Sequence, residues 1–482
     1  MVRTSSLVGM ALLWLAAGCA TTTTPVAAPA GDAARVAAAL GKLVAAPQLA
    51  GGRVGAIVVD AGSGATLAAH GADLGYATAS NMKVVSTAVA LAALGPTATT
   101  RTELSLSGVV AGGELRGELV LRGGGDPTFG EDDGRALAAF AAAVRQRGIQ
   151  RVVGRVRGDG SWQGDETLGL GWQWDYLEAD YAAPFGGLCC AGNVVTLTVA
   201  PGAEGRPTVV ADLPSVALVA EVEQVAAGQE TALTVQRPLG SMVVRVRGRI
   251  AADAKPRALR VAVADPAAAA AERLMVALQQ AGVELVAAEV PESAVEEVLA
   301  THVSPPLASI VVPLLRDSNN LYAEQVWRWA ARLRTGDGST AAAERHAKAV
   351  LAELGVPTDG MVLADGSGLS RRNLVQPRQL AALLVAAQRS PWRDAFVAGL
   401  PVAGRSGTLR NRFADGPANG RVAAKTGYIA RVAGLSGYVP RADPNAPPLV
   451  FSLLLNDYTC ANGEARAAMD AFVQELAAIA GS

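Results

Sequence analysis

The sequence is poor in aromatic residues, in cysteine and in any excess of charge. Aromatic residues make up only 4% of the chain, so its cores are expected to consist of small aliphatic side chains. The 42 basic residues balance the 43 acidic ones, which argues against a nucleic-acid partner. Apart from Cys19, the cysteines are Cys189, Cys190 and Cys460, which form neither a disulfide framework nor a metal-ligand pattern. We expect them to be small buried residues, with a bridge from one of the pair to Cys460 left open, and we expect no metal and no cofactor.

Histidine and lysine are also scarce, which restricts the choice of a general base. Only five of the 42 basic residues are lysine, at positions 42, 83, 255, 348 and 425. Arginine keeps its proton near neutral pH, whereas a lysine that is desolvated or lies near another positive charge can lose it. The three histidines stand in no catalytic motif. A lysine retained in such a chain is therefore a candidate for a titrating amine.

The apolar run near the N-terminus is too short to span a membrane comfortably. Arg3 precedes about a dozen apolar residues, which fits the central region of a secretory signal. The run ends in Leu-Ala-Ala-Gly-Cys19 and a polar tether, which resembles a bacterial lipoprotein box with Cys19 as the lipidated residue. Ordinary cleavage near Ala20 is the alternative. We expect a signal peptide at 1–19, a linker at 20–30, and export of the mature chain to the periplasm or cell envelope, with membrane attachment only through a lipid on Cys19.

Periodicity divides the rest of the chain into helical and strand-rich stretches. A length of 482 residues exceeds one ordinary core, so more than one domain is expected. Between about residues 101 and 305, short alternating strands dominate, interrupted by two helical stretches. On either side, helical patterns and strands occur together, with helices over about 31–45, 320–354, 377–389 and 464–480, and strands over about 53–69 and 421–456. The sequence therefore predicts an α/β domain in two pieces, 31–100 and 306–482, interrupted by a mostly β insertion at 101–305.

Three short motifs follow one another, at Ser80-Asn-Met-Lys83, Ser318-Asn-Asn320 and Lys425-Thr-Gly427. Each is weak alone, because a serine three residues before a lysine is usually a helix cap or a solvated pair. Together they are specific, since the first opens a helix, the second precedes one and the third lies in a strand. Residues i and i+3 share a helix face, so Lys83 is expected to reach the Ser80 hydroxyl.

A serine is a poor nucleophile until a base removes its proton, and Lys83 is the candidate base. For this role its pKa must fall from about 10.4 toward 7, a change of about 4 kcal/mol. Burial and the nearby charge of Lys425 both act in that direction. Asn320 offers an amide that can hold a substrate peptide bond. A strand beside Ser80 supplies a backbone N–H for an oxyanion hole, which contributes about 3–4 kcal/mol per donor in other enzymes.

In this order the three motifs resemble those of penicillin-binding proteins and class A β-lactamases. The gap from Ser80 to Ser318 is far longer than a β-lactamase would have. With the segments 121–128, 364–371 and 406–412, the chain is similar to class C low-molecular-mass penicillin-binding proteins, which are D-alanyl-D-alanine carboxypeptidases and endopeptidases. The resemblance covers residues 31–480 and implies a transpeptidase-type domain with an antiparallel sheet flanked by helices. It also implies that the insertion consists of two nested subdomains, the inner one at about 186–265.

The resemblance implies a serine acyl-transfer enzyme that acts on peptidoglycan peptides. It would hydrolyse the terminal D-Ala-D-Ala bond of stem peptides, together with D-Ala-diaminopimelate cross-links, and would bind β-lactams covalently. Ser80 would form the acyl-enzyme with Lys83 as its base. Ser318 would relay a proton toward the leaving amine, and Asn320 would orient the substrate.

The strand motif is implied to hold the end of the substrate. Lys425 and Thr426 would bind the terminal carboxylate, and Gly427 belongs to the same substrate-binding motif. The backbone N–H groups of Ser80 and Tyr428 would form the oxyanion hole.

The free end of a diaminopimelate side chain is implied to contact Asp159 and Arg371, although a plain turn residue is the alternative for Asp159. Some family members carry a glutamine near position 430 that helps to bind this side chain, whereas this chain has Ala430 and Arg431. Peptide specificity is therefore left open, as is the oligomeric state. Two other functions remain: a serine β-lactamase or esterase, which the long insertion disfavours, and a non-catalytic cell-wall binding protein, which the intact motifs disfavour.

Overall fold

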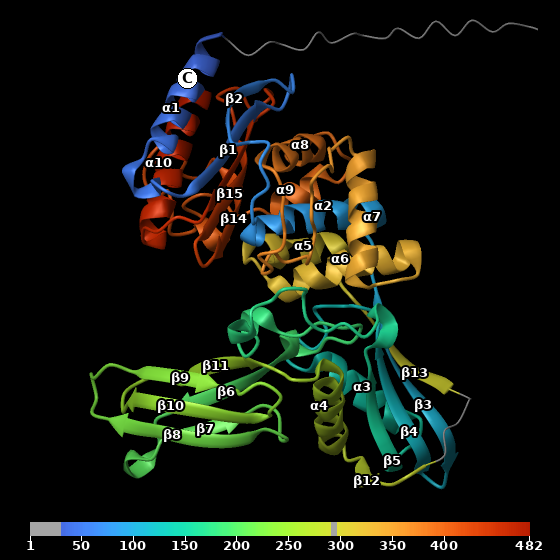
Figure 1. The fold of residues 1–482 in the computed structure, drawn as a ribbon. Coiled ribbons are helices and arrows are strands. Elements are labelled where there is room, and N and C mark those ends of the chain that lie inside the picture. The colour runs from blue at the N-terminus through green and yellow to red at the C-terminus, as the bar shows by residue number, and fades with distance from the viewer. Residues whose placement is uncertain (1–29, 291–295) are drawn as a thin grey trace, which may run out of the picture.

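The computed structural model describes residues 30–290 and 296–482. The expected signal peptide, lipidation at Cys19 and residues 20–29 of the expected linker lie outside these residues. Within the described ranges, no helix is long and apolar enough to cross a membrane. Figure 1 shows an upper lobe formed by both ends of the described chain and a lower part formed by its middle.

The upper lobe is built around a five-stranded antiparallel sheet of order β14-β15-β16-β1-β2. All residues of β15 and β16 are buried, because helices cover both faces of the sheet. The strand β14 lies at the edge. The strands are β1 (Arg53–Asp60), β2 (Thr66–His70), β14 (Ala423–Ile429), β15 (Val432–Val439) and β16 (Leu449–Asn456).

Two helical layers flank this sheet (Figure 1). The two terminal helices pack against each other on one face, and α8 packs on the other face with further helices behind it. The terminal pair is α1 (Ala30–Val44) and α10 (Asn462–Ala480). The other layer contains α2 (Met82–Leu94), α5 (Leu307–Arg316), α6 (Asn320–Thr335), α7 (Thr340–Glu353), α8 (Pro377–Gln388) and α9 (Arg393–Gly399).

The central helix of that layer is α2, which packs against α5, α6, α7 and α8. All but two of its 13 residues are buried and most of them are apolar, which is typical of a helix surrounded by protein. The helix ends at Leu94, and the next residue, Gly95, has a positive φ of 80° and precedes Pro96, which agrees with the stop signal in the sequence. A 3-10 turn, Ala79–Asn81, leads into its first residue.

The outer part of the insertion is a mixed sheet of order β12-β5-β4-β3-β13 with α3 and α4 packed against it. The chain enters and leaves it through adjacent segments, since Ser304 N donates to Thr100 O at 2.9 Å and Leu307 N donates to Ala98 O at 2.8 Å. Its elements are β3 (Arg101–Ala111), β4 (Glu114–Gly123), α3 (Arg135–Gln146), β5 (Arg151–Asp159), α4 (Pro266–Gln280), β12 (Glu284–Ala287) and β13 (Glu296–Val303).

The inner part of the insertion has two three-stranded sheets, β8-β10-β9 and β11-β6-β7, around a core of its own. Its strands are β6 (Val194–Ala200), β7 (Thr208–Ala211), β8 (Ala217–Val225), β9 (Ala232–Gln236), β10 (Val243–Ala251) and β11 (Arg257–Ala262). The expected fold class, an antiparallel sheet flanked by helices and interrupted by additional β subdomains, is therefore confirmed. The domain boundaries remain a proposal, which this topology supports.

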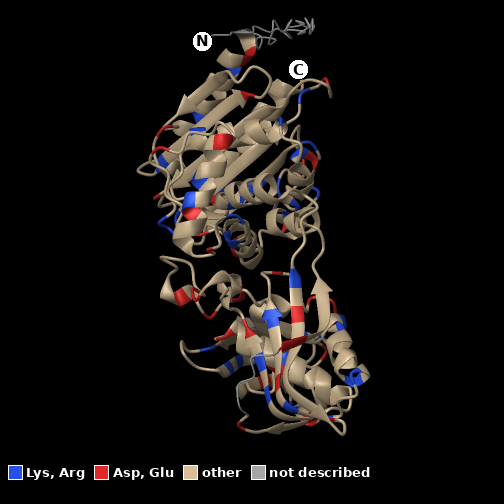
Figure 2. Ribbon diagram, turned by 90° about the vertical axis from the view of Figure 1, so that its right-hand side faces the viewer, with Lys and Arg blue, Asp and Glu red and all other residues tan. Residues whose placement is uncertain are grey.

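Charges on the outer sheet of the insertion are paired across strands. Arg122 bonds to Asp159 at 3.0 Å and to Glu296 at 2.9 Å, and Arg151 lies 3.3 Å from Glu114. Figure 2 shows basic and acidic residues interspersed along these strands.

The three described cysteines are free thiols. Cys189 and Cys190 are buried, and Cys190 belongs to the core of the insertion, whereas Cys460 packs against the core of the upper lobe. The alternative bridge to Cys460 is therefore not formed.

Candidate active site

Ser80 lies in the 3-10 turn before α2, in a backbone held by close packing. The preceding Ala79 has a φ of 44°, in the left-handed region that residues with a side chain rarely adopt. The carbonyl oxygen of Ala79 faces Gly368, where an added Cβ would come within 1.8 Å of it. Gly368 itself has a φ of 85°. A glycine in the 364–371 segment thus allows the close approach that supports the serine turn.

Lys83 joins the first two motifs. Its side chain, in the first turn of α2, is completely buried. The Nζ atom donates to Ser80 Oγ at 2.9 Å, to Asn320 Oδ1 at 2.5 Å and to the carbonyl oxygen of Ser367 at 2.7 Å. The ammonium group has three donors, so each has one acceptor.

Burial lowers the pKa of Lys83 from 10.5 to about 7, while the negative charges of Asp365 and Glu324 act in the opposite direction. Lys425 is also completely buried, and its pKa lies well below 10.5 because of burial and repulsion by Lys83. The sequence analysis attributes part of the lowering of the Lys83 pKa to the charge of Lys425. In the structure burial has the largest effect on Lys83, and the repulsion is seen at Lys425.

The second motif lies between α5 and α6. Ser318 has a φ of 63°, and its Oγ accepts a hydrogen bond of 2.9 Å from Lys425 Nζ. Asn319 caps α6 through its side chain, which accepts from Tyr322 N at 3.1 Å. Asn320 follows as the first residue of the helix, and its Nδ2 donates to the carbonyl oxygen of Tyr181 at 2.6 Å. The insertion therefore contacts the motif residue that Lys83 also contacts.

The third motif lies on β14, the edge strand, which packs against the serine turn. Lys425 and Gly427 are buried and alternate with the partly exposed Thr426 and the exposed Tyr428. At Gly427 an added Cβ would lie 2.8 Å from the side-chain nitrogen Nδ2 of Asn81, so the strand can approach the turn this closely only with glycine here. The outer edge of β14 can pair with an extended peptide as an additional strand.

A second hydroxyl lies beside the Lys-Thr-Gly motif. Thr426 Oγ1 donates to Thr408 Oγ1 at 2.7 Å. Sequence reasoning did not single out Thr408. The available signal was the segment 406–412, which was noted only as part of the resemblance.

The structure links Asp159 and Arg371 to different partners. Asp159, at the end of β5, accepts from Arg122 Nε at 3.0 Å and from Ser161 Oγ at 2.7 Å. Arg371 donates through Nη1 to the carbonyl oxygen of Ala430 at 2.5 Å, at the turn between β14 and β15. Among the described residues, no hydrogen bond or ion pair connects Asp159 to Arg371 or to the three motifs. A substrate contact by Asp159 stays a prediction.

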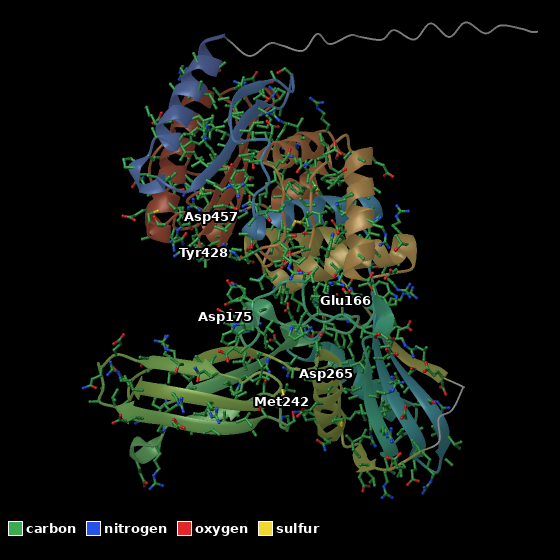
Figure 3. The ribbon with its side chains drawn as sticks, viewed as in Figure 1. Glu166, Asp175, Met242, Asp265, Tyr428 and Asp457 are labelled. Atoms are coloured by element: carbon green, nitrogen blue, oxygen red, sulfur yellow. The ribbon has the colours of Figure 1, made fainter. Side chains whose placement is uncertain are left out.

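Another acid, Asp175, belongs to the same environment as Arg371. The pKa of Tyr176 is raised by burial first and then by Asp175, and it is lowered by Arg371, so both charges lie within electrostatic reach of this ring. Tyr428 acts on the same ring. Figure 3 shows Tyr428 at the margin of the upper lobe and Asp175 on the part of the insertion that faces it. Sequence reasoning missed Asp175 because residues 161–185 carry no motif.

A family model described as the D-Ala-D-Ala carboxypeptidase 3 (S13) family matches residues 36–478. The chain belongs to this family. A D-alanyl-D-alanine carboxypeptidase of an Actinomadura species is 36% identical over 460 residues, which cover 90% of this chain and 83% of the relative.

The fold is similar to that of penicillin binding protein 4 from Haemophilus influenzae. The TM-score is 0.75 at 24% identity, with 91% of this chain and 98% of the other covered. A second structure of that protein, in complex with a β-lactam, has a TM-score of 0.72 at 23% identity and covers 92% of this chain and 99% of the other.

The family membership confirms the enzyme class that the three motifs predict. The S13 protein is a serine-type D-Ala-D-Ala carboxypeptidase of the class C low-molecular-mass penicillin-binding proteins. The structure brings Ser80, Lys83 and Asn320 together through Lys83, and Ser318 and Lys425 together through their own hydrogen bond.

Proposed function

We propose that the S13 carboxypeptidase cleaves its peptide through an acyl-enzyme on Ser80, with Lys83 as the general base. The single observation that carries this assignment is the position of the Lys83 amine, bonded to both Ser80 and Asn320. With a pKa of about 7, a large fraction of the amine is free at neutral pH. The 2.9 Å contact then lets the Ser80 hydroxyl donate its proton to the amine.

The proposed reaction proceeds in two steps. Ser80 Oγ attacks the carbonyl carbon of the penultimate D-Ala as its proton passes to Lys83, and the oxyanion accepts from the N–H groups of Ser80 and Tyr428. The C–N bond then breaks, and the leaving amine takes a proton that Ser318 relays. Water then attacks the ester, which releases the shortened peptide and restores the Ser80 hydroxyl.

The end of the substrate is proposed to bind along β14. A terminal carboxylate would accept from Lys425 and from the Thr426 hydroxyl. The Thr426 hydroxyl would then accept from Thr408, whose Oγ1 lies 2.7 Å from its own. Burial and repulsion by Lys83 keep the pKa of Lys425 low, and an adjacent substrate carboxylate would raise it again. Substrate binding and the positive charge on Lys425 are therefore expected to support each other.

The side chain of the stem peptide is proposed to extend toward Arg371. The free end of diaminopimelate carries both an ammonium and a carboxylate group, so its binding site needs one acidic and one basic side chain. Asp175 and Arg371 supply this pair in one environment, and Asp159 remains the other candidate for the acid. Cleavage of D-Ala-diaminopimelate cross-links needs the same contacts, so endopeptidase activity belongs to this proposal.

Peptidoglycan peptides as substrates and β-lactams as covalent inhibitors are the proposed partners of the site. The Haemophilus influenzae protein with this fold has been seen in complex with a β-lactam, which supports the second part. An enzyme that acts on the cell wall must be exported, in agreement with the signal peptide expected at residues 1–19. Lipidation at Cys19 is part of the proposal and is tested by mass analysis of the protein from membranes.

The test is intact-mass analysis after incubation with benzylpenicillin, followed by peptide mapping and an assay of D-alanine release from muropeptides. We expect a lasting adduct on Ser80 in the wild-type protein and none in Ser80→Ala. Rapid drug hydrolysis without a persistent adduct would instead indicate a β-lactamase. Absence of both adduct and D-alanine release would leave a non-catalytic cell-wall protein.

A further inference from the structure

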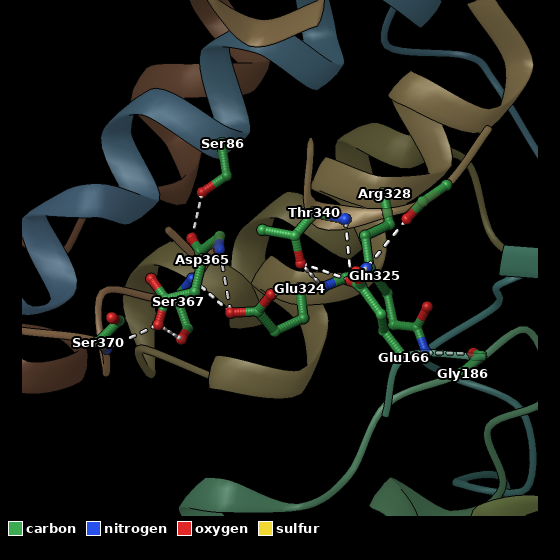
Figure 4. Close-up of polar contacts among 12 residues, drawn as sticks. Ser86, Glu166, Gly186, Glu324, Gln325, Arg328, Thr340, Asp365, Ser367 and Ser370 are labelled. Atoms are coloured by element: carbon green, nitrogen blue, oxygen red, sulfur yellow. Dashed lines mark hydrogen bonds and ion pairs between the residues drawn. The ribbon is translucent and has the colours of Figure 1, made fainter. Parts of the chain in front are cut away.

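A buried carboxyl group, that of Glu324, lies behind Lys83 and takes no part in the reaction as proposed so far. Glu324 is on α6, one turn after Asn320, so both side chains lie on the face of the helix that packs against α2. Its side chain is completely buried, like that of Lys83. Figure 4 shows Glu324 between the loop that contains Asp365 and the buried Arg328.

The carboxyl group of Glu324 is connected to Lys83 through one residue of this loop. Its Oε1 accepts from Gly366 N at 3.0 Å and from Ser367 N at 2.9 Å. The carbonyl oxygen of the same Ser367 accepts from Lys83 Nζ at 2.7 Å. Glu324 therefore fixes the position of the carbonyl oxygen that binds the amine.

The two oxygens of Glu324 have different surroundings. Oε2 has no hydrogen-bond partner within the described residues, and Arg328 Nε lies 4.0 Å away. The neighbouring Asp365 differs, because it accepts from backbone N–H groups at 2.8 and 2.7 Å and from Trp172 and Asn373 side chains. A proton can thus be added to Oε2 of Glu324 without loss of a hydrogen bond.

Backbone support alone does not require an acid at position 324. A glutamine could accept the same two N–H bonds through its Oε1 and has almost the same shape. What a glutamate adds is charge at a completely buried position, where an unpaired charge is costly. The charged groups that face it are Lys83 on α2, Asp365 on the loop and Arg328 on α6, with Lys425 beyond Lys83.

We propose that Glu324 is a positioning residue that controls the protonation of Lys83, through its charge and through the Ser367 carbonyl group. When Glu324 is ionised, it stabilises the ammonium form of Lys83. When it takes up a proton on Oε2, the neutral amine is favoured and can act as the base toward Ser80. This inference rests on the proposed role of Lys83 in acylation.

The two side chains titrate in the same range. Burial raises the pKa of Glu324 to about 7, assisted by Asp365 and opposed by Arg328. Burial lowers the pKa of Lys83 to about 7. Because the charge of Glu324 acts on the amine of Lys83, the two groups are expected to lose their protons in coupled steps.

The first test is the pH dependence of acylation by a chromogenic β-lactam, measured for wild type and Glu324→Gln. Glutamine removes the negative charge at every pH at which Glu324 is ionised in the wild type, which favours the neutral amine, so we expect the acidic limb to move to lower pH by about half to one unit. Glu475→Gln is the matched control, because the Glu475 carboxylate on α10 bonds to Lys42 of α1 at 2.9 Å, on the other side of the sheet from Lys83. We expect the control to keep the wild-type limb.

An unchanged limb in a folded Glu324→Gln protein would overturn this inference while leaving the acyl-enzyme in place. A wild-type protein that fails to react would instead overturn the proposed function. Circular dichroism and thermal unfolding identify a variant that does not fold.

The second test is a titration of Lys83 itself in the wild type and in Glu324→Gln, and it does not depend on catalysis. With lysine labelled by ¹³C, only five lysines contribute to the NMR spectrum, and the Lys83 signal can be assigned by its loss in Lys83→Arg. We expect the wild-type signal to titrate with two inflections, and the same signal in Glu324→Gln to lose the inflection that the proton of Glu324 causes. A single inflection would show that Glu324 has only a structural role.

Discussion

Replacement of Lys83 by methionine is expected to stabilise the folded protein near neutral pH while it abolishes acylation. Burial lowers the pKa of Lys83 from 10.5 to about 7, whereas the unfolded chain keeps the ordinary value. At about 1.4 kcal/mol per pKa unit, this difference costs the folded state about 4 kcal/mol at pH 7. Lys83→Met also loses the three hydrogen bonds of the amine, and each lost bond offsets about 0.5–1.5 kcal/mol of this gain in stability. The net expectation is a gain of about 1–2 kcal/mol in the free energy of unfolding.

The sign of the pH dependence follows from the same two pKa values. Between about pH 7 and 10.5 the unfolded chain holds a proton on Lys83 that the folded protein has lost. The stability contributed at this residue in the wild type therefore rises with pH through that window. The advantage of Lys83→Met should shrink over the same window and reverse at its upper end.

The assay is thermal and denaturant unfolding of wild type and Lys83→Met at both ends of this window, with β-lactam adduct formation measured in parallel. Lys348→Met is the matched control, because Lys348 is a partly exposed lysine of α7 that lies 2.8 Å from Glu344. We expect the control to change stability by less than about 0.5 kcal/mol at either pH. Equal destabilisation of Lys83→Met at both pH values would refute the claim that the buried amine is a cost to the fold.

Three further substitutions test the substrate contacts and the serine turn. Thr408→Val should raise KM by about tenfold for peptides with a free terminal carboxylate and have little effect on acylation by amidated peptides. Thr408→Ser, which keeps the hydroxyl, should match wild type. Equal effects of Thr408→Val on both kinds of peptide would contradict the role given to the Thr426 hydroxyl. Asp175→Asn should reduce kcat/KM about tenfold or more for peptides with a free diaminopimelate amine, and comparison with Asp159→Asn in the same assay decides between the two acids. Gly368→Ala should lower the melting temperature and abolish adduct formation, because its Cβ would meet a backbone oxygen at 1.8 Å; an active, equally stable variant would disprove the close approach.

Local sequence signals were sufficient for most of the elements of the upper lobe. The helix stopped by Gly95, the hairpin of β1 and β2, and the strands β14 to β16 all lie where periodicity and turn residues place them. The short helices α5 and α9 were not expected. In α5, Pro313 lies inside the helix and gives the opposite local signal. Packing against α2 and against each other stabilises α5 and α9, and no local pattern encodes that packing.

Contacts to the insertion could not be predicted from motifs. Asn320 bonds to Tyr181, and Gln325 bonds to the carbonyl oxygen of Gly186 at 2.7 Å. In both cases the acceptor is a backbone carbonyl group, which has no residue-type signature. The partners are well over a hundred residues apart in the chain, so only the folded arrangement reveals them.

The sequence by itself determined the class of enzyme and the groups proposed to react, because the types and order of residues in the three motifs predict a nucleophilic serine with two lysines. Only the tertiary structure decided how those groups behave. The pKa of Lys83 depends on complete burial and on the charges of Glu324 and Asp365, which come from segments more than two hundred residues away. Electrostatic free energies depend on distance and on the exclusion of water, and both are properties of the packed fold.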